Sequence, residues 1–246
     1  FLDNLLIELI KESKIMLKAY FNDLNKVLSK KSSAKGTKKT SVTFDISLLM
    51  EKFEGIIPSE LKISQARPIN TTGFSPEGAD FIVHKNYCRD FGTLFNGYVP
   101  FELIQGAFFF IPELKKNTLA DALNRVSSIK KINRFSDEEH NFSVPCFIVT
   151  TSVPEYSLLD IKNDVLNYYI SKGIGSEEEF ELMMIYNHGI LIKDWHSDNR
   201  RYVGLETGED TLMWFYVLMS EYVSIERDDE FDMRRYIKSD KVYNEF

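Results

Sequence analysis

Histidines are the side chains in this sequence best suited to bind a transition metal or to act as a base. The four are His84, His140, His188 and His196. His188 and His196 flank a predicted strand, and neither has a cysteine or carboxylate at metal-ligand spacing. A metal site needs three or four ligands that converge. The histidines are therefore expected at the surface or in turns.

The two cysteines, Cys88 and Cys146, lie far apart in the chain and form no metal-binding pattern. A disulfide framework is unsupported, and a reducing cytosol is the simpler expectation, which predicts a cytoplasmic protein. Cys88 has no histidine or aspartate partner nearby in the sequence, so a small buried apolar residue is its expected role.

A lysine-rich stretch, residues 30–41, could contact phosphate groups. It reads KKSSAKGTKKTS and has no apolar periodicity, which predicts a loop or linker. Lysines in such a loop can follow a nucleic-acid backbone without recognising bases, and a merely solvated loop is the alternative. The candidate nucleic-acid contacts are Lys30, Lys31, Lys35, Lys38 and Lys39.

Composition limits the function classes. The chain has 246 residues, of which 43 % are hydrophobic and 13 % aromatic, enough for one sizeable core. Its formal net charge is −7, whereas a protein that coats nucleic acid is usually basic, so broad electrostatic binding is not expected. No run of about 18 apolar residues is present, so no membrane partner is expected.

Residues 1 to about 30 have apolar side chains at helical spacing and predict one amphipathic helix. This helix either packs on the core of its own chain or is exchanged with a second subunit, which would give a homodimer or another protein partner. The predicted organisation is therefore an N-terminal helix and basic linker over residues 1–41, followed by one domain over residues 42–246.

The stretch from Val99 to Val126 organises that domain. Its apolar run, Ala107–Ile111, predicts a fully buried strand, and the helical spacing of Leu119, Leu123 and Val126 predicts a helix directly after it. A strand that leads into a helix, with another strand upstream, is a βα unit of an α/β sheet.

The other predicted elements alternate in type. Helices are expected over residues 46–55, 158–172 and 210–224, and strands over residues 61–66, 79–84, 145–151, 180–186 and 189–195. The turn Asn187-His188-Gly189 joins the last two strands into a hairpin. Gly173 is expected to end the helix before it rather than to cradle a phosphate.

Three segments stand out as motifs: residues 57–63 (IPSELKI), residues 79–85 (ADFIVHK), and a block that VPFE opens at Val99 and LADAL closes at Leu123. In this order, and without a gap inside the third, they resemble the motifs of a bacterial family of uncharacterised domains with the restriction-endonuclease-like, PD-(D/E)XK nuclease fold. The resemblance, over about residues 48–237, implies an α/β fold with a restriction-endonuclease-like core: a mixed central sheet flanked by helices, here with an added N-terminal helix.

The resemblance also implies an active site of one Asp and a Glu-x-Lys triplet. The two carboxylates would hold Mg²⁺, the metal would activate a water for phosphodiester hydrolysis, and the Lys would position that water. Asp80 matches the Asp and would be a metal ligand. The Glu position falls on Phe109 and the Lys position on Ile111, neither of which can perform that chemistry.

Three functions follow from this comparison. The preferred one is a pseudo-nuclease that binds nucleic acid or protein without a cofactor, in bacterial defence or a mobile element, where the resemblance places such domains. The second is an active Mg²⁺-dependent nuclease that uses Asp80, Glu113 and Lys115, with Glu102 as a further ligand. It requires a four-residue shift and puts Pro112 beside the ligand, which disfavours a central strand. The third is a pure protein–protein interaction module.

Overall fold

The computed structural model describes residues 17–28, 45–70, 73–85, 96–132, 143–151, 157–194 and 202–223. Its centre is a seven-stranded sheet in the order β1-β3-β5-β6-β7-β8-β9. The strands are β1 (Leu61–Ser64), β3 (Phe81–Lys85), β5 (Ile104–Ile111), β6 (Cys146–Thr150), β7 (Leu182–Ile185), β8 (Gly189–Lys193) and β9 (Tyr202–Leu205). A separate parallel pair consists of β2 (Arg67–Ile69) and β4 (Tyr98–Pro100).

The sheet is mixed. β5, β6 and β7 run parallel to one another, while β1 and β3 on one side and β8 and β9 on the other pair antiparallel. The helices α4 (Lys116–Lys130) and α5 (Leu158–Lys172) connect the three parallel strands, as parallel pairing requires a long crossover. β5 is buried on both faces, which explains its nearly unbroken apolar sequence.

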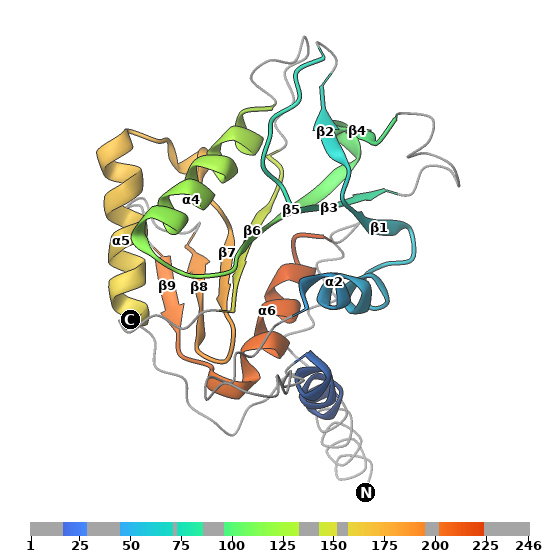
Figure 1. Cartoon of the computed structure of the whole chain (residues 1–246), viewed down its shortest axis with the longest axis vertical. Helices are drawn as coiled ribbons and strands as arrows, with labels where there is room; N and C mark the ends of the chain where they lie inside the picture. Colours follow the sequence, from blue (N-terminus) through green and yellow to red (C-terminus); the bar gives the residue numbers. More distant parts are fainter. Residues whose placement is uncertain are drawn as a thin grey trace, which may run out of the picture.

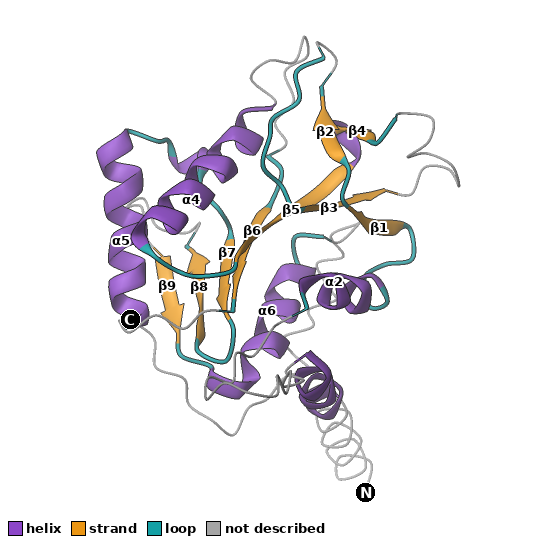
Figure 2. Ribbon diagram, viewed as in Figure 1, coloured by secondary structure: helices purple, strands orange, loops and turns teal. Residues whose placement is uncertain are grey.

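Two hydrophobic cores lie on the two faces of the sheet. Helices cover both faces (Figures 1 and 2). One core is covered by α4 and α5. The other is covered by α2 (Ile46–Glu54), α6 (Thr211–Ser220) and a helix over residues 17–28. The short 3₁₀ segments are η1 (Phe101–Leu103), η3 (Ser176–Glu178) and η4 (Gly208–Asp210).

The helix over residues 17–28 packs on its own chain along the predicted apolar stripe. Phe21, Leu24 and Leu28 are buried in the second core, and the Phe21 ring lies 5.2 Å from that of Tyr216. Lys18 also forms an ion pair with the buried Asp210. For these residues the structure matches packing in cis; residues 1–16 lie outside the described part of the chain.

Several predicted elements are confirmed. α5 has the predicted bounds, and Gly173 ends it with a φ of 63° in the left-handed region. β7 and β8 form the predicted hairpin, in which Asn187 also adopts a positive φ. The strand predicted over residues 61–66 ends at Ser64, and β2, β4 and β9 were not predicted. None of the helices in the described ranges is long and apolar enough to cross a membrane.

Candidate functional site

Asp80 lies immediately before β3 and beside the second half of β5. Its backbone N–H donates to the Phe108 carbonyl at 2.8 Å, and the Phe110 N–H donates to its Oδ2 at 2.7 Å. Since Phe81 pairs with Phe108 in the antiparallel register, these two bonds place Asp80 next to Phe109. The gap-free comparison of the sequence put the family's Glu at this same position.

Arg125 of α4 occupies the space in front of the Asp80 carboxylate. Its Nη2 lies 2.9 Å from Asp80 Oδ2, and its Nε donates to the Gly78 carbonyl at 2.7 Å. The guanidinium carbon is 5.5 Å from the centre of the Phe109 ring, a distance typical of a cation–π contact. Among the described residues, Arg125 is the cation that pairs with this carboxylate.

Gly78 makes this approach possible. Its φ is +129°, a conformation that favours glycine, and a Cβ at this position would lie 3.0 Å from Arg125 Cβ. The turn Gly73 to Gly78, predicted from its Gly and Pro residues, thus brings a carbonyl close enough to accept from the guanidinium.

Phe109 and Ile111 are both buried in the core beneath α4. Both side chains are hydrocarbons, so neither offers an oxygen or a nitrogen to a metal or a water. The side of β5 that would supply the second carboxylate and the lysine is thus part of the hydrophobic core.

Glu113 and Lys115 lie beyond the end of β5, in the connection to α4. They form an exposed ion pair with each other, with Lys115 Nζ 2.9 Å from Glu113 Oε2. Glu113 follows Phe109 by four residues, about 13 Å of extended chain, so the strand carries it away from Asp80. Glu102 is exposed in η1, before the first residue of β5. The structure does not bring these residues to Asp80.

These residues do not fit a Mg²⁺ site. Magnesium is usually held by carboxylates from the protein together with waters, and Asp80 is a single carboxylate with Arg125 in front of it. Among the residues that the structure describes, no group of three His, Cys, Asp or Glu side chains could hold a metal ion. The five lysines of residues 30–41, together with His140, His196 and Cys88, lie outside the described ranges.

His84 is buried in β3, so the expected position at the surface or in a turn is wrong for this histidine. Its Nδ1 lies 3.1 Å from the Lys85 carbonyl and its Nε2 lies 2.9 Å from Ser64 Oγ. Because a carbonyl only accepts, Nδ1 donates and Nε2 accepts from the serine in the neutral ring. Burial lowers the pKa of His84, which favours that neutral form.

A buried ionic network, not predicted from the sequence, lies where α4 ends. Lys130 Nζ is 2.5 Å from Glu181 Oε1, and the Cys146 N–H donates to Glu181 Oε2 at 2.5 Å. Close by, Tyr202 donates to Glu179 at 3.2 Å, and Lys193 Nζ is 3.9 Å from the same carboxylate. Burial lowers the pKa of Lys193 to about 8.

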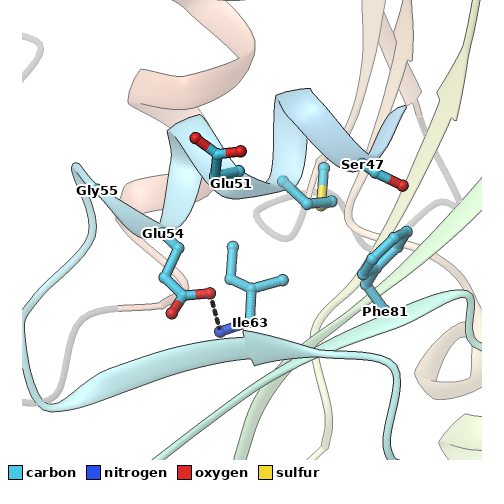
Figure 3. A pocket seen from close by; sticks show the side chains of 7 residues that line it. Ser47, Glu51, Glu54, Gly55, Ile63 and Phe81 are labelled. Carbon is cyan, nitrogen blue, oxygen red and sulfur yellow. Dashed lines mark hydrogen bonds between the residues drawn. The ribbon is translucent and has the colours of Figure 1, made fainter. Parts of the chain in front are cut away.

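A pocket of about 580 Å³ lies on the other face of the sheet, between α2 and the strands β1 and β3 (Figure 3). Its lining includes the acidic residues Glu51 and Glu54 and the apolar residues Ile63 and Phe81. The Ile63 N–H donates to Glu54 Oε2 at 3.3 Å, so this glutamate covers a backbone donor of the edge strand β1. The pocket contains none of the predicted site residues.

Arg125 is the residue of the candidate site that the sequence analysis missed. The signal was weak: an arginine directly before Val126, within the apolar pattern of the predicted helix. Nothing local indicated that this side chain would reach a carboxylate 45 residues earlier.

Comparison with known proteins relates the chain to solved structures only. No protein-family model and no curated protein sequence matches it. The apo form of NucC from E. coli MS115-1 matches with a TM-score of 0.59 and 16 % identity, over 87 % of this chain and 95 % of that one.

Two further NucC structures are similar. NucC from P. aeruginosa ATCC27853 bound to cAAA matches with a TM-score of 0.55 and 13 % identity, over 93 % of this chain and 96 % of that one. E. coli MS115-1 NucC bound to cAAA matches with a TM-score of 0.53 and 13 % identity, over 93 % of this chain and 94 % of that one. Such a likeness concerns the fold: this chain has the nuclease-like α/β fold of NucC, and the predicted mixed sheet flanked by helices is confirmed.

Proposed function

We propose that this chain is a pseudo-nuclease of bacterial defence: it keeps a nuclease fold, does not cleave phosphodiesters, and acts by binding nucleic acid or a protein. The observation that carries the proposal is the environment of Asp80, where Phe109 stands in place of a second carboxylate and Arg125 pairs with the first.

The chemistry supports this proposal. Metal-assisted hydrolysis needs a cation that both activates a water and stabilises charge on the scissile phosphate. A guanidinium can stabilise an anion but cannot lower the pKa of a bound water as a metal does. Arg125 therefore supplies a positive charge, but it does not activate a water to act as the nucleophile.

The part of the proposal that concerns bacterial defence rests on the similarity of the fold to NucC. The similar NucC structures, two of them bound to cAAA, support a nuclease-fold protein of bacterial defence. They also make cAAA, a cyclic oligonucleotide, the first nucleic-acid ligand to test. The net charge of −7 disfavours broad electrostatic binding to DNA, so a specific ligand or a protein partner fits better.

A cleavage assay tests the loss of activity. Purified protein is incubated with plasmid DNA and with single-stranded RNA in Mg²⁺ or Mn²⁺, with and without cAAA, beside Asp80→Ala. We expect no cleavage above that of the variant. Cleavage that is lost in Asp80→Ala would overturn the proposal in favour of a Mg²⁺-dependent nuclease, and Glu113→Gln and Lys115→Met would then show whether the shifted triplet takes part.

A binding assay separates the remaining alternatives. Calorimetry with cAAA and with a short DNA duplex is expected to detect at least one of these two ligands. If neither binds and no cleavage occurs, the chain is better explained as a protein–protein interaction module.

A further inference from the structure

The strand β1 has an open edge. It stands at the end of the sheet with β3 as its neighbour, and none of the described strands pairs along its other side. The N–H of Leu61 donates to the Pro58 carbonyl and that of Ile63 donates to Glu54, so both point away from β3. Because the N–H and C=O of a residue face the same neighbour in an antiparallel ladder, the Ile63 carbonyl also faces the open edge.

Glu54 of α2 holds the position that the carbonyl of a further strand would take. Figure 3 shows this side chain reaching from the helix to the backbone of Ile63, whose own side chain points toward α2. An unpaired edge N–H is a template for another chain, and a charged side chain beside it limits unwanted pairing. The bond is 3.3 Å long, more than is usual for an N–H donor, so a strand carbonyl can replace the glutamate.

The pocket beside this edge has the composition that a basic side chain requires. Its lining combines the carboxylates of Glu51 and Glu54 and the hydroxyl of Ser47 with the apolar side chains of Met50, Ile63 and Phe81. A lysine or arginine packs its methylene groups on apolar surface and keeps its charged head at polar groups. Glu51 pairs with Lys52 at 3.1 Å, and an exposed pair of this kind is exchanged at little cost.

We propose that β1 and this pocket bind an extended segment of a partner protein that carries a lysine or arginine. The segment pairs antiparallel with β1, and its basic residue lies opposite Ile63 and exchanges both backbone hydrogen bonds with it. Residues that are opposite each other in a sheet project to the same face, so the basic side chain enters the pocket on the side of Ile63. Glu54, released from the backbone, pairs with that side chain. Strand addition of this kind takes its affinity from the main chain and its specificity from the pocket.

Charge favours a basic protein segment over nucleic acid at this surface. The two carboxylates of the pocket repel phosphates, and the net charge of −7 favours a basic partner. The pocket lies on the opposite face of the sheet from Phe109 and its neighbour Arg125. The inference is therefore independent of the account of Asp80 and does not fail with it.

A peptide titration of the full chain tests the proposal. The probe is the capped peptide Thr-Val-Thr-Lys-Thr-Val-Thr, added to isotope-labelled protein and followed by nuclear magnetic resonance. The contact is much smaller than a standard interface, so we expect a Kd of about 0.1–1 mM and a saturating shift of the Ile63 amide signal. A signal that does not shift up to several millimolar peptide would overturn the proposal.

The role of the carboxylates is tested with Glu51→Gln/Glu54→Gln. Glutamine retains an oxygen for the Ile63 N–H, so the free chain keeps its edge bond. The Kd should rise about fivefold or more for the lysine peptide and stay the same for a peptide with norleucine in place of lysine. Glu206→Gln is the matched control, an exposed glutamate directly after β9 at the other edge of the sheet. Equal weakening by the control, or an unchanged Kd in the double variant, would refute the pocket.

A methylated peptide tests the strand addition. Methylation of the lysine backbone nitrogen removes the N–H that donates to the Ile63 carbonyl and leaves the side chain intact. We expect its Kd to be at least about tenfold higher. Equal affinity would show that the pocket takes a basic side chain without adding a strand to β1, and would overturn the proposal.

Discussion

Two ion pairs connect α4 to the sheet, and they differ in what surrounds them. Lys130 and Glu181 have side-chain exposures of 0 % and 4 %, whereas Arg125 and Asp80 have 25 % and 38 %. Both oxygens of Glu181 are used, one by Lys130 and one by the Cys146 N–H. On Asp80, Arg125 and the Phe110 N–H both bond to Oδ2.

The difference in exposure assigns a structural role to the Lys130–Glu181 pair and leaves the Arg125–Asp80 pair at the candidate functional site. The Lys130 pair is enclosed and its bonds are internal, so it can only hold elements together. The Asp80 pair lies at the position that the resemblance assigns to a metal ligand, and water reaches both partners. The helix α4 thus contributes two cations five residues apart: Lys130, whose ion pair is buried, and Arg125, whose ion pair is more exposed.

Breaking the buried pair should have the largest effect. Lys130→Met leaves the carboxylate of Glu181 buried without its cation, which typically costs about 3–5 kcal/mol. Urea unfolding followed by circular dichroism measures the change. The double variant Lys130→Met/Glu181→Leu should recover part of the loss, since it removes the uncompensated charge but leaves the Cys146 N–H without its acceptor. A single-variant loss below about 1 kcal/mol would show that the pair is solvated.

Lys193 extends the buried region and predicts a pH dependence. Its pKa is lowered to about 8 from 10.5, so between these values the unfolded chain binds more protons than the folded one. Stability from this group therefore rises with pH above 8 and is constant below it, with a slope of at most about 1.4 kcal/mol per pH unit.

The measurement is the free energy of unfolding between pH 7 and 9.5. The tyrosines and the thiol of Cys146 begin to ionise in the unfolded chain within this range, but they contribute equally to wild type and to a Lys193 variant and cancel in the difference. Lys193→Met is the control, and we expect wild type minus variant to increase with pH above 8. A constant or falling difference would contradict the lowered pKa.

The half-exposed pair should contribute less. Asp80→Asn and Arg125→Gln should each cost about 1–2 kcal/mol, as expected for a charge-assisted hydrogen bond that water partly screens. A double-mutant cycle should give a coupling energy of about 1 kcal/mol. Coupling as large as that of Lys130 with Glu181 would erase the distinction between the two regions.

The surface pair Glu113–Lys115 should have the smallest effect. Exposed ion pairs contribute about 0–1 kcal/mol, so Glu113→Gln should leave the urea midpoint nearly unchanged. A large loss of stability would mean that Glu113 has a buried role that its exposure does not suggest.

Local pattern was sufficient for most of the elements but not for the ion pairs. The apolar run of β5, the periodicity of α5 and the Asn-Gly turn of the β7–β8 hairpin are short-range signals, and the structure confirms them. β9, only four residues long, was missed because little in Tyr202–Leu205 distinguishes a strand from a loop.

The partners of the charged residues depend on the tertiary fold. Lys130 reaches a carboxylate 51 residues later and Arg125 one 45 residues earlier, and a lysine or arginine in a helix predicts a solvated side chain. The sequence assigned Phe109 and Ile111 to the family's Glu and Lys positions by alignment alone, and that assignment stays a prediction. What surrounds Asp80 could come only from the structure.

Metal binding at Asp80 tests the central claim most directly. Mn²⁺ is titrated by calorimetry into wild type and into Asp80→Ala. If Arg125 and Phe109 have replaced the metal site, neither protein will show stoichiometric binding. Stoichiometric binding in wild type that disappears in Asp80→Ala would contradict the account and establish a working carboxylate site.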